Sequence, residues 1–161
     1  MKMKNTQTIK PIGVIHTPFK DNDRIPIQGG LAQKIKGQIE VFPEYALGLK
    51  DVEGFSHIIL LYVFHKSKDY NLLAKPFLDD QLRGVFAIRT PHRPNPIGLT
   101  IVKLEWLEGN ILHVSGMDMI DGTPLLDIKP YVPEFDAKEN VEIGWLKDKR
   151  ERMHHTFNKL T

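Results

Sequence analysis

Hydrophobic residues along this chain gather in short segments rich in β-branched and aromatic side chains, several of them bounded by Gly, Pro, Asn or Asp. This composition is typical of β-strands and of the turns that separate them. Six segments fit it: residues 12–19 (IGVIHTPF), 34–42 (KIKGQIEVF), 55–64 (FSHIILLYVF), 84–90 (GVFAIRT), 99–107 (LTIVKLEWL) and 110–120 (NILHVSGMDMI). Six short strands in one small region predict a mainly β fold, either a barrel or a sandwich.

Turns and short helices are predicted between and after these strands. Gly109 and Asn110 indicate a hairpin, because both residue types tolerate the positive φ of a tight turn. Residues 42–54 (FPEYALGLKDVEG) predict a short helix with Pro43 at its start and a glycine at its end. The tail from about Glu139 predicts a helix with one apolar stripe and a charged, solvated face. The stripe contains Ile143, Leu146, Met153, Phe157 and Leu160, and the cations that lie mainly elsewhere are Lys147, Lys149, Arg150 and Arg152.

Length and composition favour a single domain that needs neither a disulfide nor a structural metal ion. The chain has 161 residues and no cysteine, which excludes disulfides, thiol nucleophiles and Cys-type zinc sites and fits a cytoplasmic protein. The longest apolar run, residues 58–64, is far too short to span a membrane, and the lysine-rich start lacks the apolar core of a signal peptide. The net charge of +2 is below that of a dedicated nucleic-acid binder, so charge alone neither indicates nor excludes an RNA partner.

The segment RTPHRPNPIG, residues 89–98, combines stiffness with cationic groups. Its three prolines lock their own φ and restrict the residues before them. In an extended chain Arg89 and Arg93 point the same way, with Asn95 two residues further on. A stiff surface connection would explain the prolines, but the arginines and the asparagine add a binding capacity, so we favour a binding loop.

Other polar residues lie at strand ends and turns. Asp118, Asp121 and Asp127 surround a turn at Asp121 and Gly122, and by themselves they indicate local turn bonds, with a metal site or a site for an amine or sugar hydroxyl as alternatives. His57 and His65 end a buried strand, where a histidine is more often a hydrogen-bonded boundary residue than a catalyst. The chain lacks Gly-x-Gly, Gly-x-Ser-x-Gly and His-Glu-x-x-His, so it carries no dinucleotide fingerprint and none of the common hydrolase or metalloprotease motifs.

Two of these segments, GVFAIRTPHRPNPIGLTIVKL and DGTPLLDIKPYVP, together with FSHI and FH upstream and PIGVIHTPF at the start, closely resemble the TsaA-like (TrmO) family. The resemblance runs from about Pro11 to Pro133. It implies a mainly β, small six-stranded β-barrel with short helices and a C-terminal helix. The whole chain, 1–161, would then be one domain with its core at about 9–133 and a helical tail at about 139–161.

The same resemblance implies an S-adenosyl-L-methionine-dependent methyltransferase that acts as a homodimer on tRNA and uses no metal. Its reaction would methylate N6 of threonylcarbamoyladenosine, the modified base next to the anticodon. Such a transfer needs the methyl group and the acceptor nitrogen held in line and shielded from water, which agrees with the missing motifs.

Positions that the resemblance assigns to the cofactor are Pro26, Ile27, Gln28, His65, Lys66, Arg89, Leu99, Ser115, Gly116, Met117 and Asp118. Ile27 stands where the family usually has an arginine in a Pro-Arg-Gln loop. Arg89 suits the methionine carboxylate through a bidentate fork, Asp118 or Asp121 suits its amine or the ribose hydroxyls, and backbone around Met117 suits the adenine. We expect Arg93 and Asn95 to face the anionic substrate as candidate catalytic residues, with Asp121 and Thr123 as further substrate contacts.

Two alternatives stay open from the sequence. The chain could be a module that binds S-adenosyl-L-methionine, or a methyltransferase acting on a small molecule, without activity on tRNA. The three aspartates leave a weaker alternative, a metal-dependent hydrolase.

Overall fold

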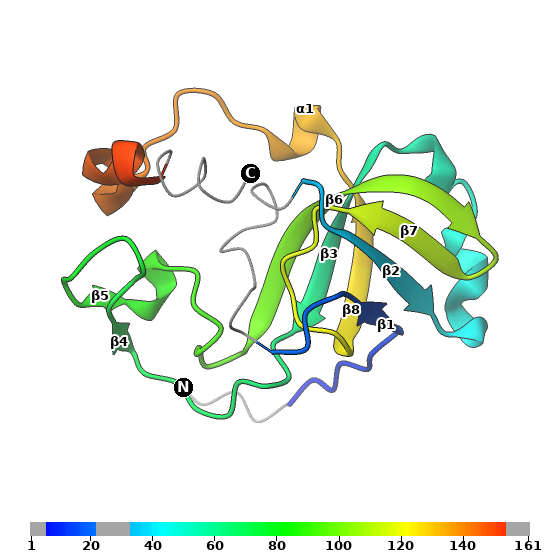
Figure 1. The fold of residues 1–161 in the computed structure, drawn as a ribbon, viewed down its shortest axis with the longest axis horizontal. Helices are drawn as coiled ribbons and strands as arrows, with labels where there is room; N and C mark the ends of the chain where they lie inside the picture. Colours follow the sequence, from blue (N-terminus) through cyan, green and yellow to red (C-terminus); the bar gives the residue numbers. More distant parts are fainter. Residues whose placement is uncertain (1–5, 22–32, 154–161) are drawn as a thin grey trace.

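The computed structural model describes residues 6–21 and 33–153, and its main body is a closed six-stranded barrel (Figure 1). The strands lie in the order β1-β2-β7-β6-β3-β8, and every neighbouring pair is antiparallel. They are β1 (Gly13–His16), β2 (Lys36–Val41), β3 (His57–Val63), β6 (Ile97–Glu108), β7 (Ile111–Ser115) and β8 (Thr123–Pro130). The predicted hairpin joins β6 to β7, with Gly109 at a φ of 62°.

Inward-facing side chains, which alternate with exposed ones along the strands, fill the barrel interior. In β6 buried and exposed residues alternate from Ile97 to Glu105, which is the period expected of a strand with one face on the core. Fully buried inward positions include Ile15, Ile39, Ile58, Leu60, Leu112, Met117 and Leu125. The predicted mainly β barrel is therefore confirmed, with its core supplied by all six strands.

The sixth barrel strand is β8, and the strand predicted at residues 84–90 was wrong. Residues 83–84 form β5 (Arg83–Gly84), which pairs only with β4 (Leu73–Ala74), and residues 85–87 form the 3₁₀ helix η5 (Val85–Ala87). Val85 and Ile88 are buried three residues apart, which matches a 3₁₀ turn rather than a strand. Segment 123–130 was missed because its prolines and charges resemble a loop. Both prolines lie near the ends of β8, where they cost few ladder bonds.

The helices are short. The helix predicted at 42–54 is split into two 3₁₀ helices, η3 (Pro43–Leu49) and η4 (Val52–Gly54), with Asp51 between them at a φ of 68°. After the barrel come α1 (Pro133–Asp136) and η6 (Gly144–Lys149), which continues as helix to residue 153. The predicted tail helix thus begins later than Glu139, and Phe157 and Leu160 lie outside the described residues. In the part of the chain that is described, no helix is long and apolar enough to cross a membrane.

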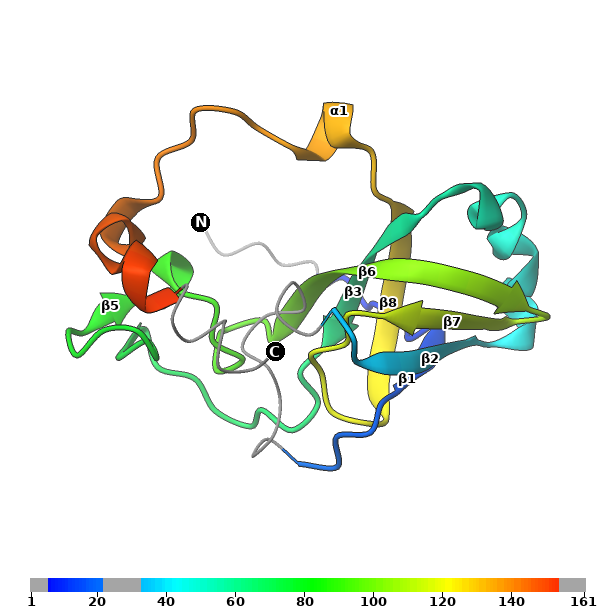
Figure 2. The same cartoon turned by 45° about the horizontal axis from the view of Figure 1, so that its top comes forward.

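Residues 64–96 leave the barrel and return to it beside their starting point, because Val63 and Ile97 are register partners in the β3–β6 pair. This excursion carries β4, β5 and η5, and η6 packs against it beside the barrel (Figures 1 and 2). We call residues 64–96 and 144–153 together the side lobe. The indole Nε1 of Trp145 donates to the carbonyl of Ala87 at 2.8 Å, which joins the two parts.

Charged side chains of the tail also hold the side lobe together. Asp79, which is buried, accepts from Arg83 at 2.6 Å and lies 3.5 Å from Lys149. Nη1 of Arg152 lies 3.4 Å from the carbonyl of Leu78. Two of the four tail cations therefore make internal contacts, where the sequence predicted only a solvated face.

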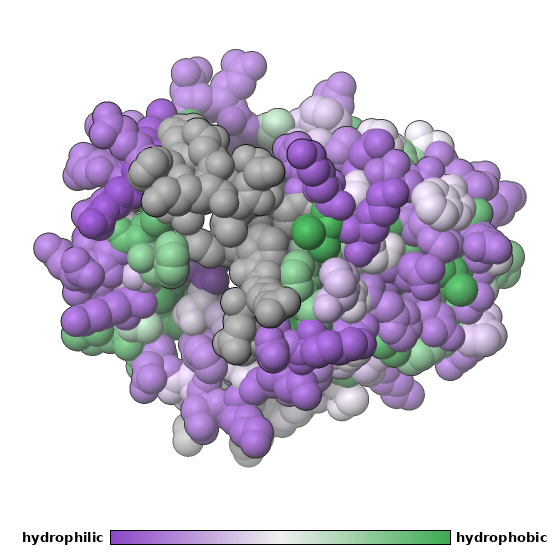
Figure 3. Space-filling model, in the orientation of Figure 1, coloured by the Kyte–Doolittle hydropathy of each residue, from purple (hydrophilic) through white to green (hydrophobic). Residues whose placement is uncertain are grey.

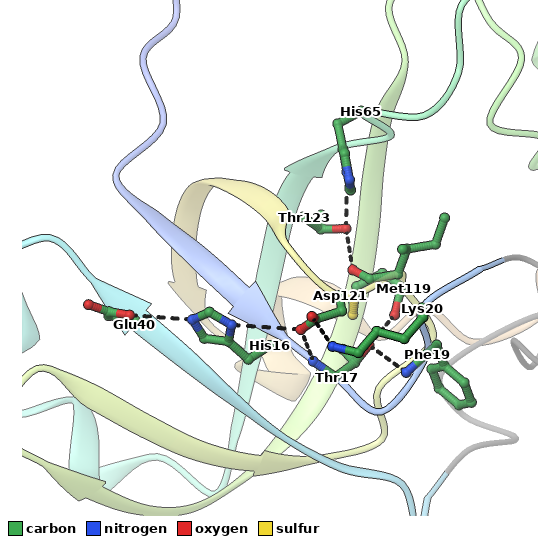
Figure 4. A network of polar contacts seen from close by, with 10 residues as sticks. His16, Thr17, Phe19, Lys20, Glu40, His65, Met119, Asp121 and Thr123 are labelled. Atoms are coloured by element: carbon green, nitrogen blue, oxygen red, sulfur yellow. Dashed lines mark hydrogen bonds and ion pairs between the residues drawn. The ribbon is translucent and has the colours of Figure 1, made fainter.

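Asp121 links the chain leaving β1 to the chain entering β8 (Figure 4). Its Oδ1 accepts from the backbone N–H of Thr17 at 3.0 Å, its Oδ2 accepts from Lys20, and the Thr17 hydroxyl donates to the carbonyl of Met119 at 2.8 Å. The hydrogen bond from Lys20 holds the pKa of Asp121 below its usual value, with the Thr17 N–H adding to the effect. The network joins the two segments beside the β1–β8 pair, whose backbone ladder closes the barrel.

Asp121→Asn tests this link through its pH dependence. A lowered pKa means that ionised Asp121 stabilises the fold above the ordinary carboxyl pKa of about 3.9, and that this contribution is lost as the pH falls through the folded-state pKa. We expect the variant to have a lower free energy of unfolding at pH 7 and a shallower pH dependence between about pH 5 and 2, measured by urea unfolding. Glu44→Gln, an exposed change on η3 at the other end of the β1–β2 pair, is the control. A pH profile equal to that of the wild type would contradict the assigned role.

Gly98 allows a close approach between β3 and β6. It is the register partner of Tyr62, and a Cβ at this position would lie 2.2 Å from Cε2 of the Tyr62 ring. The ring is buried and packs edge-on against Phe64 at 5.4 Å, so little free space surrounds it. Position 98 therefore requires glycine for packing.

Gly98→Ala should displace the Tyr62 ring and lower the free energy of unfolding by about 1–3 kcal/mol, the usual cost of overpacking. Denaturant unfolding monitored by circular dichroism measures the change. Gly48→Ala in η3, where an added Cβ meets nothing within 4 Å, is the matched control and should be close to neutral. An unchanged unfolding midpoint for Gly98→Ala would show that the ring moves without cost.

Candidate functional site

A cavity of about 420 Å³ lies where the barrel meets the side lobe. Four segments converge on it: the end of β3 with the following turn, the loop 89–93, the start of β6, and the connection from β7 to β8. Its lining residues are Tyr62, Phe64, His65, Lys66, Ser67, Arg89, Thr90, Pro91, His92, Arg93, Ile97, Gly98, Leu99, Asp118, Met119, Ile120 and Thr123.

A buried chain of hydrogen bonds presents Asp118 to this cavity. The hydroxyl of Tyr62 lies 3.0 Å from that of Thr100, which in turn lies 2.6 Å from Oδ1 of Asp118. Because an ionised carboxylate only accepts, Thr100 donates to Asp118 and Tyr62 donates to Thr100. Burial raises the pKa of Tyr62, and the charge of Asp118 raises it further, so the phenol keeps its proton. The result is a carboxylate held in one orientation.

Cationic and neutral donors from other segments line the same cavity. Arg89 and Lys66 line the cavity and are exposed, while His65 is half-buried. Burial lowers the pKa of His65, and the neighbouring Lys66 lowers it further, which keeps the imidazole neutral at pH 7. The Thr123 hydroxyl donates to the carbonyl of Ile120 at 2.6 Å and lies 3.5 Å from Nδ1 of His65 (Figure 4). The cavity therefore combines positive charge, one fixed negative charge and a neutral imidazole.

The proline-rich loop is held by its own side chains. Nη1 of Arg93 donates to the carbonyls of Ile88 at 3.0 Å and Thr90 at 3.3 Å. Nδ1 of His92 lies 3.2 Å from the hydroxyl of Ser67, in the turn that follows β3. The stiffness expected from three prolines is thus supplemented by side-chain bonds that fix the loop over the site.

A second hollow of about 600 Å³ lies over the outer face of β6, and Arg89 and Leu99 line both hollows. Ser115 and Gly116 line only this second one, where the Ser115 hydroxyl donates to Glu105 at 2.7 Å. That bond is the main cause of the lowered pKa of Glu105. The two hollows are therefore adjacent, and Arg89 stands between them.

The structure brings together part of the set predicted from the sequence. The first cavity contains His65, Lys66, Arg89, Leu99 and Asp118 from the cofactor set and Arg93 and Thr123 from the substrate set. Met117 is fully buried in the barrel core, and neither Asn95 nor Asp121 lines the cavity. Pro26, Ile27 and Gln28 lie outside the described residues. The roles assigned to all these residues stay predictions.

The three aspartates of the hydrolase alternative do not converge. Asp118 accepts from Thr100, Asp121 from Lys20, and Asp127 from Lys129 at 2.7 Å. Across residues 6–21 and 33–153, no group of three or more His, Cys, Asp or Glu side chains is placed to share a metal ion.

Sequence reasoning missed Tyr62 and Thr100, the residues that hold Asp118. Both occupy buried positions of hydrophobic strands, and no motif marks them. A usable signal was present, because a hydroxyl at a buried strand position needs a hydrogen-bond partner.

Comparison with known proteins supports the family suggested by the motifs. Residues 14–137 match the model of the tRNA-methyltransferase O N-terminal domain. A probable S-adenosyl-L-methionine-binding protein of Pyrococcus abyssi is 58% identical over 137 residues, which cover 85% of this chain and 74% of that protein. A tRNA (adenine(37)-N6)-methyltransferase of Mus musculus is 43% identical over 83% of this chain.

Among solved structures, the crystal structure of TrmO from Pseudomonas aeruginosa superposes with a TM-score of 0.74 and 39% identity over 88% of this chain. The present chain spans 63% of that protein and 33% of the mouse enzyme. Since the family model covers most of the barrel and the relatives exceed 30% identity over most of the chain, we conclude that this chain belongs to the tRNA-methyltransferase O family, whose N-terminal domain it contains.

Proposed function

We propose that this protein binds S-adenosyl-L-methionine between the barrel and the side lobe and transfers its methyl group to N6 of threonylcarbamoyladenosine next to the anticodon of tRNA. Family membership supports the cofactor and the acceptor, since relatives are named both as binding proteins for this cofactor and as tRNA adenine-N6 methyltransferases. The observation that carries the proposal is the placement of Arg89 and Asp118 on one cavity. A tRNA substrate agrees with the expected cytoplasmic location.

The chemistry of the cavity fits the cofactor. The methionine part of S-adenosyl-L-methionine carries a carboxylate and an ammonium, which match the guanidinium of Arg89 and the oriented carboxylate of Asp118. Apolar side chains of Phe64, Leu99 and Ile120 supply a surface for its uncharged portions. Backbone groups around Gly116, in the adjacent hollow, are available to the adenine.

Residues of this chain would bind, orient and shield the reactants. When bound, the cofactor supplies an electrophilic methyl group on a sulfonium centre, and transfer from it needs mainly alignment and exclusion of water. The loop tied by Arg93 would hold the acceptor nitrogen over the cavity. His65, neutral because its pKa is lowered, is able to accept the proton that the acceptor nitrogen loses. Asn95 stays a candidate for the substrate side.

We further propose that the protein acts as a homodimer. The outer face of β6 exposes Ile97, Leu99 and Ile101 by 42%, 47% and 40%, a stripe next to the second hollow. A second copy on this stripe would cover apolar surface beside Arg89.

A second candidate is binding of S-adenosyl-L-methionine without tRNA methylation. The P. abyssi relative at 58% identity is named only as a probable binding protein for the cofactor, which favours this alternative. Both candidates place the cofactor in the same cavity and differ only in the acceptor.

Incubation with methyl-labelled S-adenosyl-L-methionine and tRNA, with or without the threonylcarbamoyl group, separates the two. We expect label on the threonylcarbamoyladenosine nucleoside alone after digestion and chromatography. The Asp118→Asn variant, which removes the charge expected to hold the ammonium, is the negative control. Cofactor binding by calorimetry without any labelled nucleoside would favour the second candidate.

Arg89→Lys tests the cofactor site directly. Lysine keeps the charge but loses the planar fork, so we expect S-adenosyl-L-methionine to bind more weakly by about 1–3 kcal/mol in calorimetry. Arg150→Lys, an exposed change in the tail, is the matched control and should bind the cofactor as the wild type does. Equal affinities for both variants would remove Arg89 from the site.

A further inference from the structure

The side lobe exposes two phenylalanines beside a hollow. Phe77 and Phe86 are 75% and 79% exposed, and both line a hollow of about 630 Å³. Its lining also includes Trp145 and Met153 from the tail. Since the Trp145 indole is bonded to the Ala87 carbonyl at 2.8 Å, this part of the lining is fixed to the segment that carries Phe86. Figure 3 shows apolar surface set among polar side chains at the end of the molecule where Figure 1 places the side lobe.

Positive charge is concentrated in the same lobe. Residues 64–96 and 144–153 contain ten lysines or arginines and five aspartates or glutamates, a net charge of +5, whereas the whole chain carries only +2. The rest of the chain is therefore negative, at −3. Lys75 lies on the hollow itself, and Lys149 and Arg152 are anchored beside it through Asp79 and the Leu78 carbonyl. Exposed aromatics within a positive field are the pattern of single-stranded nucleic-acid binding.

The hollow is adjacent to the proposed cofactor cavity. Arg89, Thr90 and Pro91 line both of them. A ligand that places one base in the cavity would therefore extend its neighbouring nucleotides across this rigid segment toward Phe77 and Phe86.

We propose that Phe77 and Phe86 stack on unpaired nucleobases, so that the side lobe binds the single-stranded loop of the RNA whose modified base enters the cavity. This inference rests on the proposed function and identifies where its substrate is held. Stacking on a phenyl ring tolerates any base, so the two phenylalanines would recognise the unpaired loop, and the cavity would select the base. A second copy of the chain is the less suitable occupant, because two lobes of charge +5 would repel each other.

Fluorescence anisotropy tests the role of Phe77 and Phe86. The probes are a fluorescein-labelled anticodon stem-loop RNA and the duplex stem alone. We expect Phe77→Ala and Phe86→Ala each to weaken binding of the stem-loop by about fivefold to a hundredfold, the range of stacking contributions. Binding of the duplex stem, and the dependence of affinity on salt, should stay unchanged, because no phosphate contact is removed. Phe135→Ala on α1, at 74% exposure, is the matched control and should bind the stem-loop as the wild type does.

Each of these binding results would overturn the inference: wild-type protein that does not bind the stem-loop, a double Phe77→Ala, Phe86→Ala variant with wild-type affinity, an equal loss in Phe135→Ala, or an equal loss for the duplex stem. Loss of self-association by the double variant in sedimentation velocity would show that the surface is an interface between copies, and would also overturn it. A methyl-transfer assay distinguishes this inference from the proposed function. RNA binding through the phenylalanines without methylation would refute only the proposed activity. Methylation without any effect of the phenylalanines would refute only the stacking on Phe77 and Phe86.

Discussion

The pairing of β3 with β6 is the constraint on which the rest of the structure depends. Its register extends from His57 opposite Lys103 to Val63 opposite Ile97, so the chain that leaves β3 must return beside its own exit. That return makes residues 64–96 a lobe outside the barrel. The same register places the Tyr62 ring over Gly98 and its hydroxyl beside Thr100, and thereby fixes the orientation of Asp118.

Electrostatics inside the site follow from this frame. A carboxylate held by a protonated tyrosine through a threonine hydroxyl is ordered, which fixes the position of its negative charge at the cavity. Arg89 lines the same cavity from the proline-stiffened loop, and the other arginine of that loop, Arg93, donates to backbone carbonyls. The proposed binding of a zwitterionic cofactor rests on these opposite charges, which two different segments bring to one cavity.

The barrel and the side lobe supply different groups. Strand pairing from β1 to β8 closes the barrel, core packing and the Asp121 link support it, and its rim supplies the buried polar residues of the cavity. The side lobe supplies the positive charge and the exposed aromatics, and its contacts with the tail depend on Trp145 and Asp79. Under the proposed function, the cavity would hold the cofactor and the side lobe would contact the RNA.

Hydrophobic alternation in the sequence was sufficient to predict the mainly β fold, the β6–β7 hairpin and five of the barrel strands, because period and turn residues are local properties. Family motifs brought Arg89, His65 and Asp118 into one predicted site, and the structure places all three on one cavity.

Other features were decided only by tertiary structure. Strand β8 is a strand because β1 and β3 pair with it on both sides, whereas its prolines and charges locally resemble a loop. Residues 84–90 have the composition of a strand, yet among the described residues they pair with no strand of the barrel. The roles of Tyr62 and Thr100, and the contact of Trp145 with Ala87, join residues far apart in the chain, and such partners are set by packing and register rather than by any local pattern.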